Sequence, residues 1–366
     1  MIPAGLVTGA LLGLLAVALL LSLSITAVRG VRTLRRLRRE RLAAPVRGTL
    51  LELLCAQQDE QPALLDRLAG IDARTWAALE PTVAALLDKV SGTARTMLVL
   101  LYERRGSATD AIADLRSRSA ARRGRAAQVL GRLRHRPAAP ALSRLLDDRD
   151  PEVRRAGARA LGRTGGPEAV PDLLGCLHGP RPVPPDVVSA ALASLGPDAW
   201  PRLASGLVDP VPLVRAVAIE VLGATGGIAH AADIVLALRE DPDTGVRIRA
   251  ARALGRLGMP DGLEPLLAAV TPGRPVALRI AAAGALGSLG AAAATGPLSD
   301  LLGDEDPHVA AGAARALLRL GPAGGAALHK AADDRPDARA AAQARAALAE
   351  AAVGGVRHDL LVGVVF

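Results

Sequence analysis

The sequence predicts an all-α protein: an α-solenoid of stacked helical hairpins, preceded by one transmembrane helix. Two observations predict this architecture. A pattern of alanine, leucine, arginine and glycine recurs about every 31 residues through most of the chain, and residues 2–28 form an uncharged, apolar run. A constant repeat of this length is typical of arrays in which each helical unit packs only against its neighbours.

The first predicted element is a transmembrane anchor at residues 1–28. As a helix, residues 2–28 would be about 40 Å long, enough to cross a hydrocarbon core of about 30 Å. A cleaved signal peptide is the competing interpretation, but it requires positive charge before the apolar run. No basic residue precedes Ile2, so we expect an uncleaved, single-pass anchor.

A basic juxtamembrane helix is predicted at residues 29–48, which hold eight arginines and one acid, Glu40. Basic flanks remain on the cytoplasmic side of a membrane. We therefore expect a cell-membrane protein with its N-terminus outside and the rest of the chain in the cytoplasm. The arginines either set this topology alone or also contact anionic headgroups, at about 1 kcal/mol each. The membrane-surface candidates are Arg29, Arg32, Arg35, Arg36, Arg38, Arg39 and Arg41.

Three glycines, Gly5, Gly9 and Gly13, repeat every four residues within the predicted anchor. Glycines at this spacing let another membrane helix pack closely, so they favour association of the anchor with itself or with a partner. Glycine is also common in membrane helices in general. Both interpretations remain open from the sequence.

The repeat is measured by a recurring leucine, which we call the reference leucine. The intervals between successive reference leucines are 31, 31, 30, 32, 32, 31 and 31 residues. They are Leu130, Leu161, Leu192, Leu222, Leu254, Leu286, Leu317 and Leu348. An arginine stands seven residues before five of them, and Pro185, Ala310 and Ala341 take its place in the others. This constancy predicts a repeat array over residues 119–350.

One unit, residues 151–186, illustrates the predicted hairpin. Asp150 is a good N-cap, and Pro151 suits the first helical turn. Gly165 and Gly166 are expected to end the first helix, because glycine adopts positive φ at low cost. Pro167 can begin the second helix. We expect the second helices to form the inner curve of the array and to provide its docking surface.

The repeats resemble HEAT repeats, particularly the short bacterial form called phycobilisome-lyase HEAT-like. Their pattern is D-x-x-V-R-x-x-A-x-x-A-L-G, carried best by residues 150–165, 243–258 and 276–290. The resemblance covers roughly 119–350 and implies a protein-binding scaffold, since such solenoids mostly bind other proteins. It also implies that the arginines and the turn aspartates join neighbouring repeats. These residues are Arg123, Arg154, Arg215, Arg247, Arg279, Asp150, Asp243 and Asp306.

The segments that flank the array fit the repeat poorly. Residues 49–118 hold apolar clusters broken by Gly70, Pro81 and Gly92, so we expect a divergent N-terminal helical cap, because terminal units of solenoids are atypical. Residues 351–366 form an apolar C-terminal tail that is too short to span a membrane. This tail either covers the last repeat or binds a partner.

Charge is distributed unevenly along the chain, which carries a formal net charge of +9. Residues 137–366 have two more acids than bases, so the array is nearly neutral and its face is not expected to follow phosphates. Residues 103–136 hold ten arginines and three acids. These arginines fit a solvated helix face, the membrane surface or an acidic partner. Nucleic acid is disfavoured, because few aromatic residues are present for base stacking.

No enzyme signature occurs in the sequence. There is no phosphate-binding glycine loop, no G-x-S-x-G and no H-x-x-x-H pair. Cys55 and Cys176 are far apart, and we expect both to be reduced thiols. We therefore predict no catalytic or metal site and no cofactor.

The leading hypothesis is a membrane-anchored cytoplasmic scaffold that docks an unidentified protein partner. Two alternatives remain: a HEAT-like lyase or isomerase, and nucleic-acid binding through residues 103–136.

Lysine occurs only at Lys89 and Lys330, which is typical of a GC-rich bacterial genome.

Overall fold

A computed structural model of the chain describes residues 4–57, 59–334 and 339–362. The described residues form helices and contain no strand, which confirms the all-α prediction. The chain divides into two compact units, residues 1–111 and residues 112–366. Among the residues whose side chains the structure describes, which leave out residues 4–18, we find no helix with enough apolar length to cross a membrane.

The first unit begins with one long helix, α1 (Ala4–Cys55). From Ala4 onward, this helix runs without a break through the predicted anchor, the predicted basic helix and the start of the predicted cap. Its last turns bury Leu50 and Leu53. The helices that complete the unit are α2 (Gln61–Ala69), α3 (Ala73–Leu87) and α4 (Gly92–Arg104), and α5 (Ser107–Asp114) follows across the unit boundary.

Trp76 and Tyr102 pack edge to face in this unit, with ring centroids 5.3 Å apart. The Arg105 guanidinium lies 4.5 Å above the Trp76 ring, and its Nη1 donates to the Ala69 carbonyl at 2.8 Å. Partial burial lowers the pKa of Arg105. Arg105 therefore stabilises the first unit from within and is not a free surface charge.

The second unit contains the predicted repeats. Each repeat has a first helix that carries a reference leucine, and every such leucine from Leu130 to Leu317 is buried. The first helices are α6 (Ala120–Leu133), α8 (Pro151–Thr164), α10 (Pro185–Ser194), α12 (Pro212–Thr225), α14 (Thr244–Leu257), α16 (Val276–Leu289) and α18 (Pro307–Arg319). The buried leucines confirm the register that their spacing predicted.

The second helices are shorter, and each begins with a 3₁₀ turn. They are α7 (Ala139–Ser143), α9 (Val170–Gly175), α11 (Trp200–Ala204), α13 (Ala231–Glu240), α15 (Leu263–Ala269) and α17 (Thr295–Asp300). The leading turns are η1 (Arg136–Ala138), η3 (Pro167–Ala169), η4 (Pro197–Ala199), η6 (Ile228–His230), η7 (Pro260–Gly262) and η8 (Ala292–Ala294). Three trailing turns are η2 (Arg144–Asp147), η5 (Ser205–Val208) and η9 (Leu301–Gly303).

The array closes with α19 (Pro322–Asp334) and α20 (Arg339–Val362). The predicted boundary after residue 350 is absent, because α20 continues through Gly354 and Gly355 as one helix. The side chains from residue 354 onward and all of residues 363–366 lie outside the described part of the chain. The proposed roles of the C-terminal tail therefore stay predictions.

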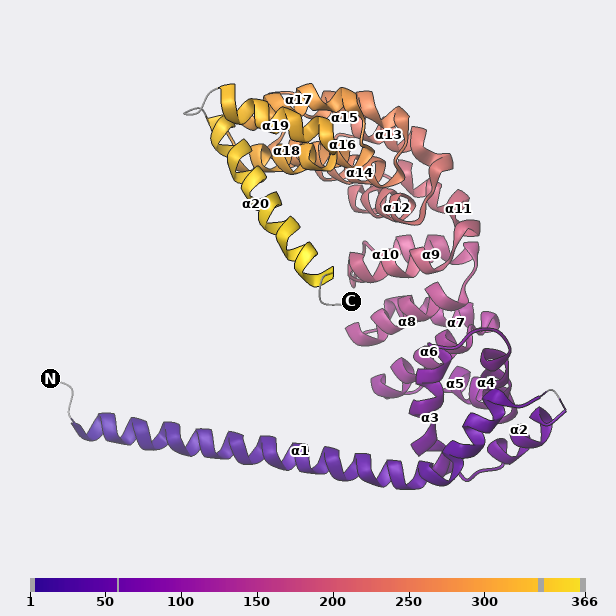
Figure 1. Cartoon of the computed structure of the whole chain (residues 1–366). Helices are drawn as coiled ribbons and strands as arrows, with labels where there is room; N and C mark the ends of the chain where they lie inside the picture. The colour runs from indigo at the N-terminus through magenta and orange to yellow at the C-terminus, as the bar shows by residue number, and fades with distance from the viewer. Residues whose placement is uncertain (1–3, 58, 335–338, 363–366) are drawn as a thin grey trace. The chain divides into compact units, whose positions relative to one another are not determined.

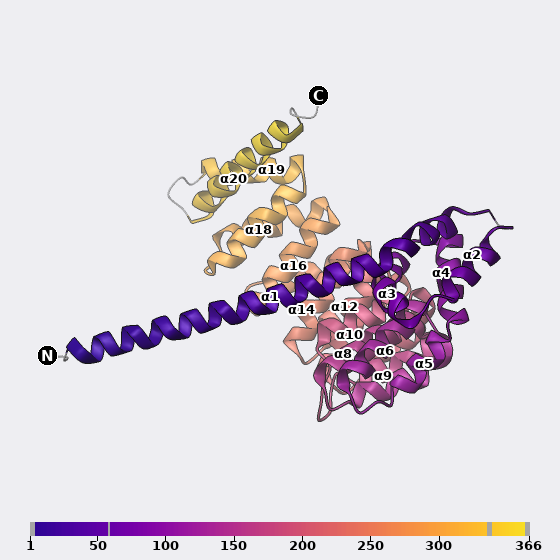
Figure 2. The same ribbon diagram turned by 90° about the horizontal axis from the view of Figure 1, so that it is seen from below.

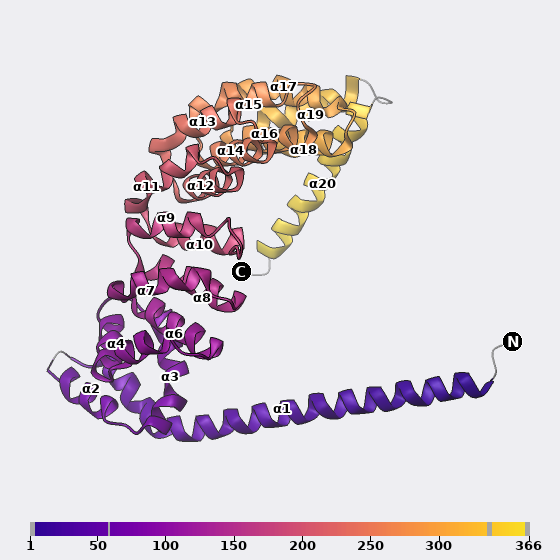
Figure 3. The same cartoon turned by 180° about the vertical axis from the view of Figure 1, so that it is seen from behind.

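The first helices, not the second, line the concave side of the second unit. Figures 1 and 3 show α8, α10, α12, α14, α16 and α18 on the inner side of the arc, with α7, α9, α11, α13, α15 and α17 outside them. Figure 2 shows the same first helices following one another in chain order. The prediction that the second helices form the inner curve is wrong.

Small residues explain this direction of curvature. Where two first helices meet, a glycine after the reference leucine faces an alanine of the next helix. A Cβ added to Gly131 would lie 2.8 Å from the Ala160 Cα, and one added to Gly255 would lie 2.7 Å from the Ala285 Cα. These contacts let the first helices approach closely. The second helices pack through leucine and isoleucine side chains such as Leu142, so they stand further apart.

The first helix of the repeat at residues 151–186 ends differently from the prediction. Gly165 has φ −72° and Gly166 has φ −104°, so neither residue adopts the predicted positive φ. Glycine is required at 165 for space, because an added Cβ would lie 2.7 Å from the Ala169 Cβ. The predicted left-handed cap occurs in other repeats, at Gly226 and Gly258.

Candidate functional site

Arginines at the start of the first helices join neighbouring repeats. Arg123 donates from Nε and Nη2 to the two carboxylate oxygens of Asp148, both at 2.7 Å. Arg215 binds Asp241 in the same way, at 2.7 and 2.8 Å. We call these contacts the inter-repeat pairs, and they are Arg123–Asp148, Arg215–Asp241 and Arg279–Asp304. The two-bond fork of the first two pairs is the strongest geometry that a guanidinium makes with a carboxylate. Arg279 reaches Asp304 through Nη1, and its Nε donates to the Arg274 carbonyl at 3.1 Å.

The aspartates in these pairs differ from the predicted ones. Asp150 accepts hydrogen bonds from the amides of Glu152 and Val153 in its own helix, at 2.8 and 3.2 Å. Asp243 and Asp306 cap their helices in the same manner. An N-cap carboxylate is turned toward its own helix. The residue two positions earlier is therefore the one that reaches the arginine of the preceding repeat.

Two of the predicted arginines have no such carboxylate. The Nε atoms of Arg154 and Arg247 are buried without a hydrogen-bond partner. Counted from the reference leucine, the position of the missing aspartate is held by Gly179 and Gly273, both at positive φ. The aspartate of the inter-repeat pair is thus missing at two places in the array, which we call the interruptions. In two other repeats the arginine is absent instead, and Pro185 and Ala310 hold its position.

The inter-repeat pairs make stability depend on pH. Burial is the largest single influence and raises the pKa of Asp148 and Asp241. The hydrogen bonds from Arg123 and Arg215, the backbone amides two residues on and the nearby arginine charges together outweigh it, so both pKa values lie below their usual value. The stabilisation is complete above the usual aspartate pKa of about 4 and is lost as pH falls through the lowered pKa. We expect thermal melts of an Asp148→Asn/Asp241→Asn variant to lose part of this acid dependence. Equal pH dependence in variant and wild type would contradict the assignment.

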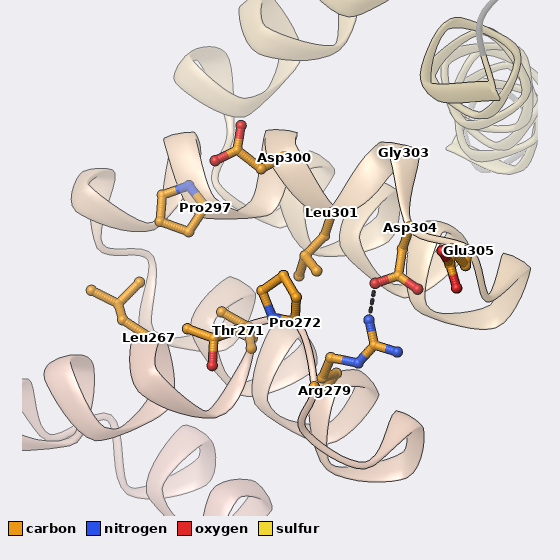
Figure 4. Close-up of a pocket in the computed structure, with 12 residues that line it drawn as sticks. Leu267, Thr271, Pro272, Arg279, Pro297, Asp300, Leu301, Gly303, Asp304 and Glu305 are labelled. Atoms are coloured by element: carbon orange, nitrogen blue, oxygen red, sulfur yellow. Dashed lines mark hydrogen bonds and ion pairs between the residues drawn. The ribbon is translucent and has the colours of Figure 1, made fainter.

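Figure 4 shows the Arg279–Asp304 pair at the edge of a cavity of about 730 Å³. Pro272, Pro297 and Leu301 form its apolar part. Gly273 lies in the loop between α15 and α16 that borders this cavity. The cavity therefore lies next to one of the two interruptions.

Charge is segregated within the array, although the array is nearly neutral as a whole. The uncovered faces of the first helices point to the concave side and carry many arginines. They are Arg125 and Arg132 on α6, Arg155, Arg159 and Arg163 on α8, Arg249, Arg252 and Arg256 on α14, and Arg315 and Arg319 on α18. Most of the acids lie in the turns and second helices. The near-neutral overall charge therefore conceals a basic concave face, and the expectation that this face does not follow phosphates stays a prediction.

The concave arginines follow two rows defined by the reference leucines. Two residues after the leucine, Arg256 and Arg319 donate to the carbonyls of Glu220 and Gly284 on the preceding first helix, at 3.4 and 2.8 Å. This row joins adjacent helices. Two residues before the leucine stand Arg159, Arg252 and Arg315, all exposed. Glu220 holds the same position in α12 and pairs with Arg249. The three arginines of this second row have no ion pair or hydrogen bond within the described chain, so their charges are available to a ligand.

The predicted basic cluster at 103–136 is divided by the fold. Arg104 pairs with Asp66, and Arg105 is held against Trp76, both in the first unit. Arg123 makes an inter-repeat pair, whereas Arg125 and Arg132 join the concave face. The remaining members are Arg116, Arg118, Arg122, Arg134 and Arg136. The cluster is therefore no single surface.

The other predicted site residues lie on α1 or concern cysteine and metal. Arg29, Arg38 and Arg41 are exposed, while the side chains of the other membrane-surface arginines and the surroundings of the anchor glycines lie outside the described residues. Cys55 and Cys176 are free thiols, and burial raises the pKa of Cys176 to about 12. Among the described residues, no His, Cys, Asp and Glu group could hold a metal.

The concave row could have been found from sequence. Arg159, Arg252 and Arg315 occupy one position relative to the reference leucine, and residues at one repeat position share one face of a solenoid. Net charge over residues 137–366 concealed this pattern, because the turn acids cancel the arginines.

Comparisons with known proteins agree with this architecture. The sequence matches the HEAT repeats family at residues 108–196, 200–277 and 263–349. A search of curated proteins finds no match. Among solved structures, the chain is similar to the CpcE–CpcF complex of phycocyanin lyase from Nostoc sp. PCC7120, with 28% identity over 61% of this chain and 92% of that chain, at a TM-score of 0.33.

Two further solved structures show the range of similar proteins. Human deoxyhypusine hydroxylase is 20% identical over 75% of this chain and 99% of its own, at a TM-score of 0.31. The karyopherin Kap121p, bound to the extreme C-terminus of the protein phosphatase Cdc14p, is 15% identical over 82% of this chain and 41% of its own, at a TM-score of 0.44. The family match spans more than half of the sequence, so the chain belongs to the HEAT repeat family.

Proposed function

We propose that this HEAT repeat protein is a scaffold that binds an acidic segment of a protein partner along its concave face. One observation carries the proposal: Arg159, Arg252 and Arg315 are exposed on that face and have no partner among the residues that the structure describes. First helices pack roughly 8–10 Å apart, so this row extends over several tens of ångströms. An elongated acidic polypeptide matches both this length and this charge. The proposal gives the chain no catalytic role.

We further propose that the N-terminal part of α1 anchors this scaffold in the cell membrane, with the array in the cytoplasm. The uncharged run at 2–28 and the arginines that follow it support this proposal. An anchor would raise the concentration of the scaffold near a membrane-bound partner without adding contacts. Packing at Gly5, Gly9 and Gly13 would allow the anchor to associate with itself or with the partner.

The docking proposal is tested by removing the charges of Arg159, Arg252 and Arg315. An Arg159→Gln/Arg252→Gln/Arg315→Gln variant should lose a partner that the wild-type chain recovers from detergent-solubilised membranes, because its acidic segment no longer finds complementary charge. Quantitative mass spectrometry of the recovered proteins measures this loss. We expect a reduction of at least tenfold and a recovered protein with an acidic stretch.

A charge-matched control is available on other surfaces of the array. Arg144, Arg149 and Arg202 are exposed and make no ion pair or side-chain hydrogen bond within the described chain, and replacing all three by glutamine should leave recovery unchanged. Equal loss of the partner in both variants would show that only overall charge matters and would contradict the proposal. Recovery of nucleic acid in place of an acidic protein would support the alternative partner.

The anchor is tested separately by fractionation. The complete chain should remain in the membrane pellet after an alkaline carbonate wash, and a chain that begins at residue 29 should be released. Release of the complete chain would contradict the anchor while leaving the docking proposal intact.

A further inference from the structure

At the interruption beside Arg247, the loop has lost its aspartate and has also gained an arginine. The loop before α16 reads Thr-Pro-Gly-Arg-Pro at residues 271–275. Gly273 takes the place of the aspartate, and Arg274 follows it. The other interruption repeats this change, with Gly179, Pro180 and Arg181 before α10. At both places the turn has changed from negative to positive charge.

A small cavity of about 200 Å³ lies at the interruption beside Arg247. Three arginines line it: Arg239 from the end of α13, Arg247 from α14 and Arg274 from the loop. The apolar part of its lining includes Leu238 and Leu278. None of the described residues that line it is acidic.

The hydrogen-bonding capacity of these arginines is largely unused. Arg247 donates from Nη2 to the Thr244 hydroxyl at 2.9 Å, and its Nε has no partner. The guanidinium groups of Arg239 and Arg274 are exposed and have no partner within the described chain. At the other interruption, Arg181 instead donates to the Asp147 carbonyl. The cavity beside Arg247 is therefore the one with three guanidinium groups left to bind an anion.

We infer that this cavity is a carboxylate-binding site, in which an external carboxylate takes the place of the missing aspartate. The three inter-repeat pairs show which ligand an arginine at this repeat position binds, since each holds a planar carboxylate. The apolar walls suit a short aliphatic stem. The ligand is either a free small carboxylate or a glutamate side chain of a bound polypeptide. This inference does not rest on the proposed function, because the site is built from the inter-repeat turns and not from the concave row.

Isothermal titration calorimetry of the complete chain in a neutral detergent tests the site, at constant ionic strength. Glutarate should bind saturably with one site per chain, and Arg274→Gln should weaken binding at least tenfold. The charge-matched variant Arg256→Gln, on the concave face, should bind as the wild type does. Absence of saturable binding, or equal weakening in both variants, would overturn the inference.

Two further titrations identify the source and the class of the anion. Tighter binding of a hexaglutamate peptide than of glutarate, weakened by Arg274→Gln and kept in the Arg159→Gln/Arg252→Gln/Arg315→Gln variant, assigns the site to a partner protein. Tighter binding of glutarate assigns it to a free carboxylate. Inorganic phosphate should bind more weakly than glutarate, because the site replaces a carboxylate. Tighter binding of phosphate would overturn the assignment to carboxylates.

Discussion

Replacing Asp241 by asparagine is expected to lower the free energy of unfolding of the array by about 3 kcal/mol, near the lower end of the cost of breaking a buried ion pair. The side chains of Arg215 and Asp241 are only 11% and 6% exposed. Without the carboxylate, the Arg215 guanidinium stays buried without its ion-pair partner and keeps only the weaker attraction of Asp243 and Asp209. Arg247 also loses a favourable charge, since it helps to lower the pKa of Asp241. Denaturant unfolding followed by circular dichroism measures the effect.

Asp209 provides the matched control for this substitution. It occupies the same repeat position as Asp241, but Pro185 stands where the partner arginine would be. Its carboxylate accepts a hydrogen bond from the Val211 amide at 2.8 Å, which an asparagine oxygen can also accept. Asp209 also attracts Arg215 but accepts no hydrogen bond from it through its carboxylate. Asp209→Asn should therefore change stability by less than about 1 kcal/mol, well below the loss at Asp241. Similar losses for both variants would show that the ion pair is not the cause.

Replacing Gly287 by alanine is expected to destabilise the array by about 2 kcal/mol, a typical cost of overpacking. The added Cβ would lie 2.7 Å from the Cα of Ala316 and 2.9 Å from its Cβ. Both atoms belong to the next first helix, so α16 and α18 must separate. A lower melting temperature measures the cost.

Gly284 lies in the same helix, and we expect its replacement by alanine to have the opposite effect on stability. A Cβ there meets only the flexible end of Arg319, at 3.8 Å. Gly284→Ala should raise stability by up to about 1 kcal/mol, because alanine favours the helix more than glycine does. If Gly284→Ala destabilised the array as much as Gly287→Ala, close helix approach would not explain the glycine at 287.

The repeat was predictable because it is a local property of the chain. Spacing of the reference leucines requires only that each helix bury one apolar face against its neighbours. Asp150 was predicted both as an N-cap and as an inter-repeat support, and the structure retains only the first role. A cap depends on its own helix, whereas a partner in the next repeat depends on how far the helices are rotated and separated.

The sequence by itself determined the helical class, the repeat length, the buried leucines and the positions of the arginines, because each follows from helical periodicity and from the cost of exposing apolar surface. Only the tertiary structure decided which helix layer faces inward, which aspartate meets Arg123, and which arginines remain without partners. Those outcomes depend on distances between residues about 25 or more positions apart, such as Arg123 and Asp148, and on the close approach of helices at Gly287. The periodicity of one helix gives no information about distances between helices.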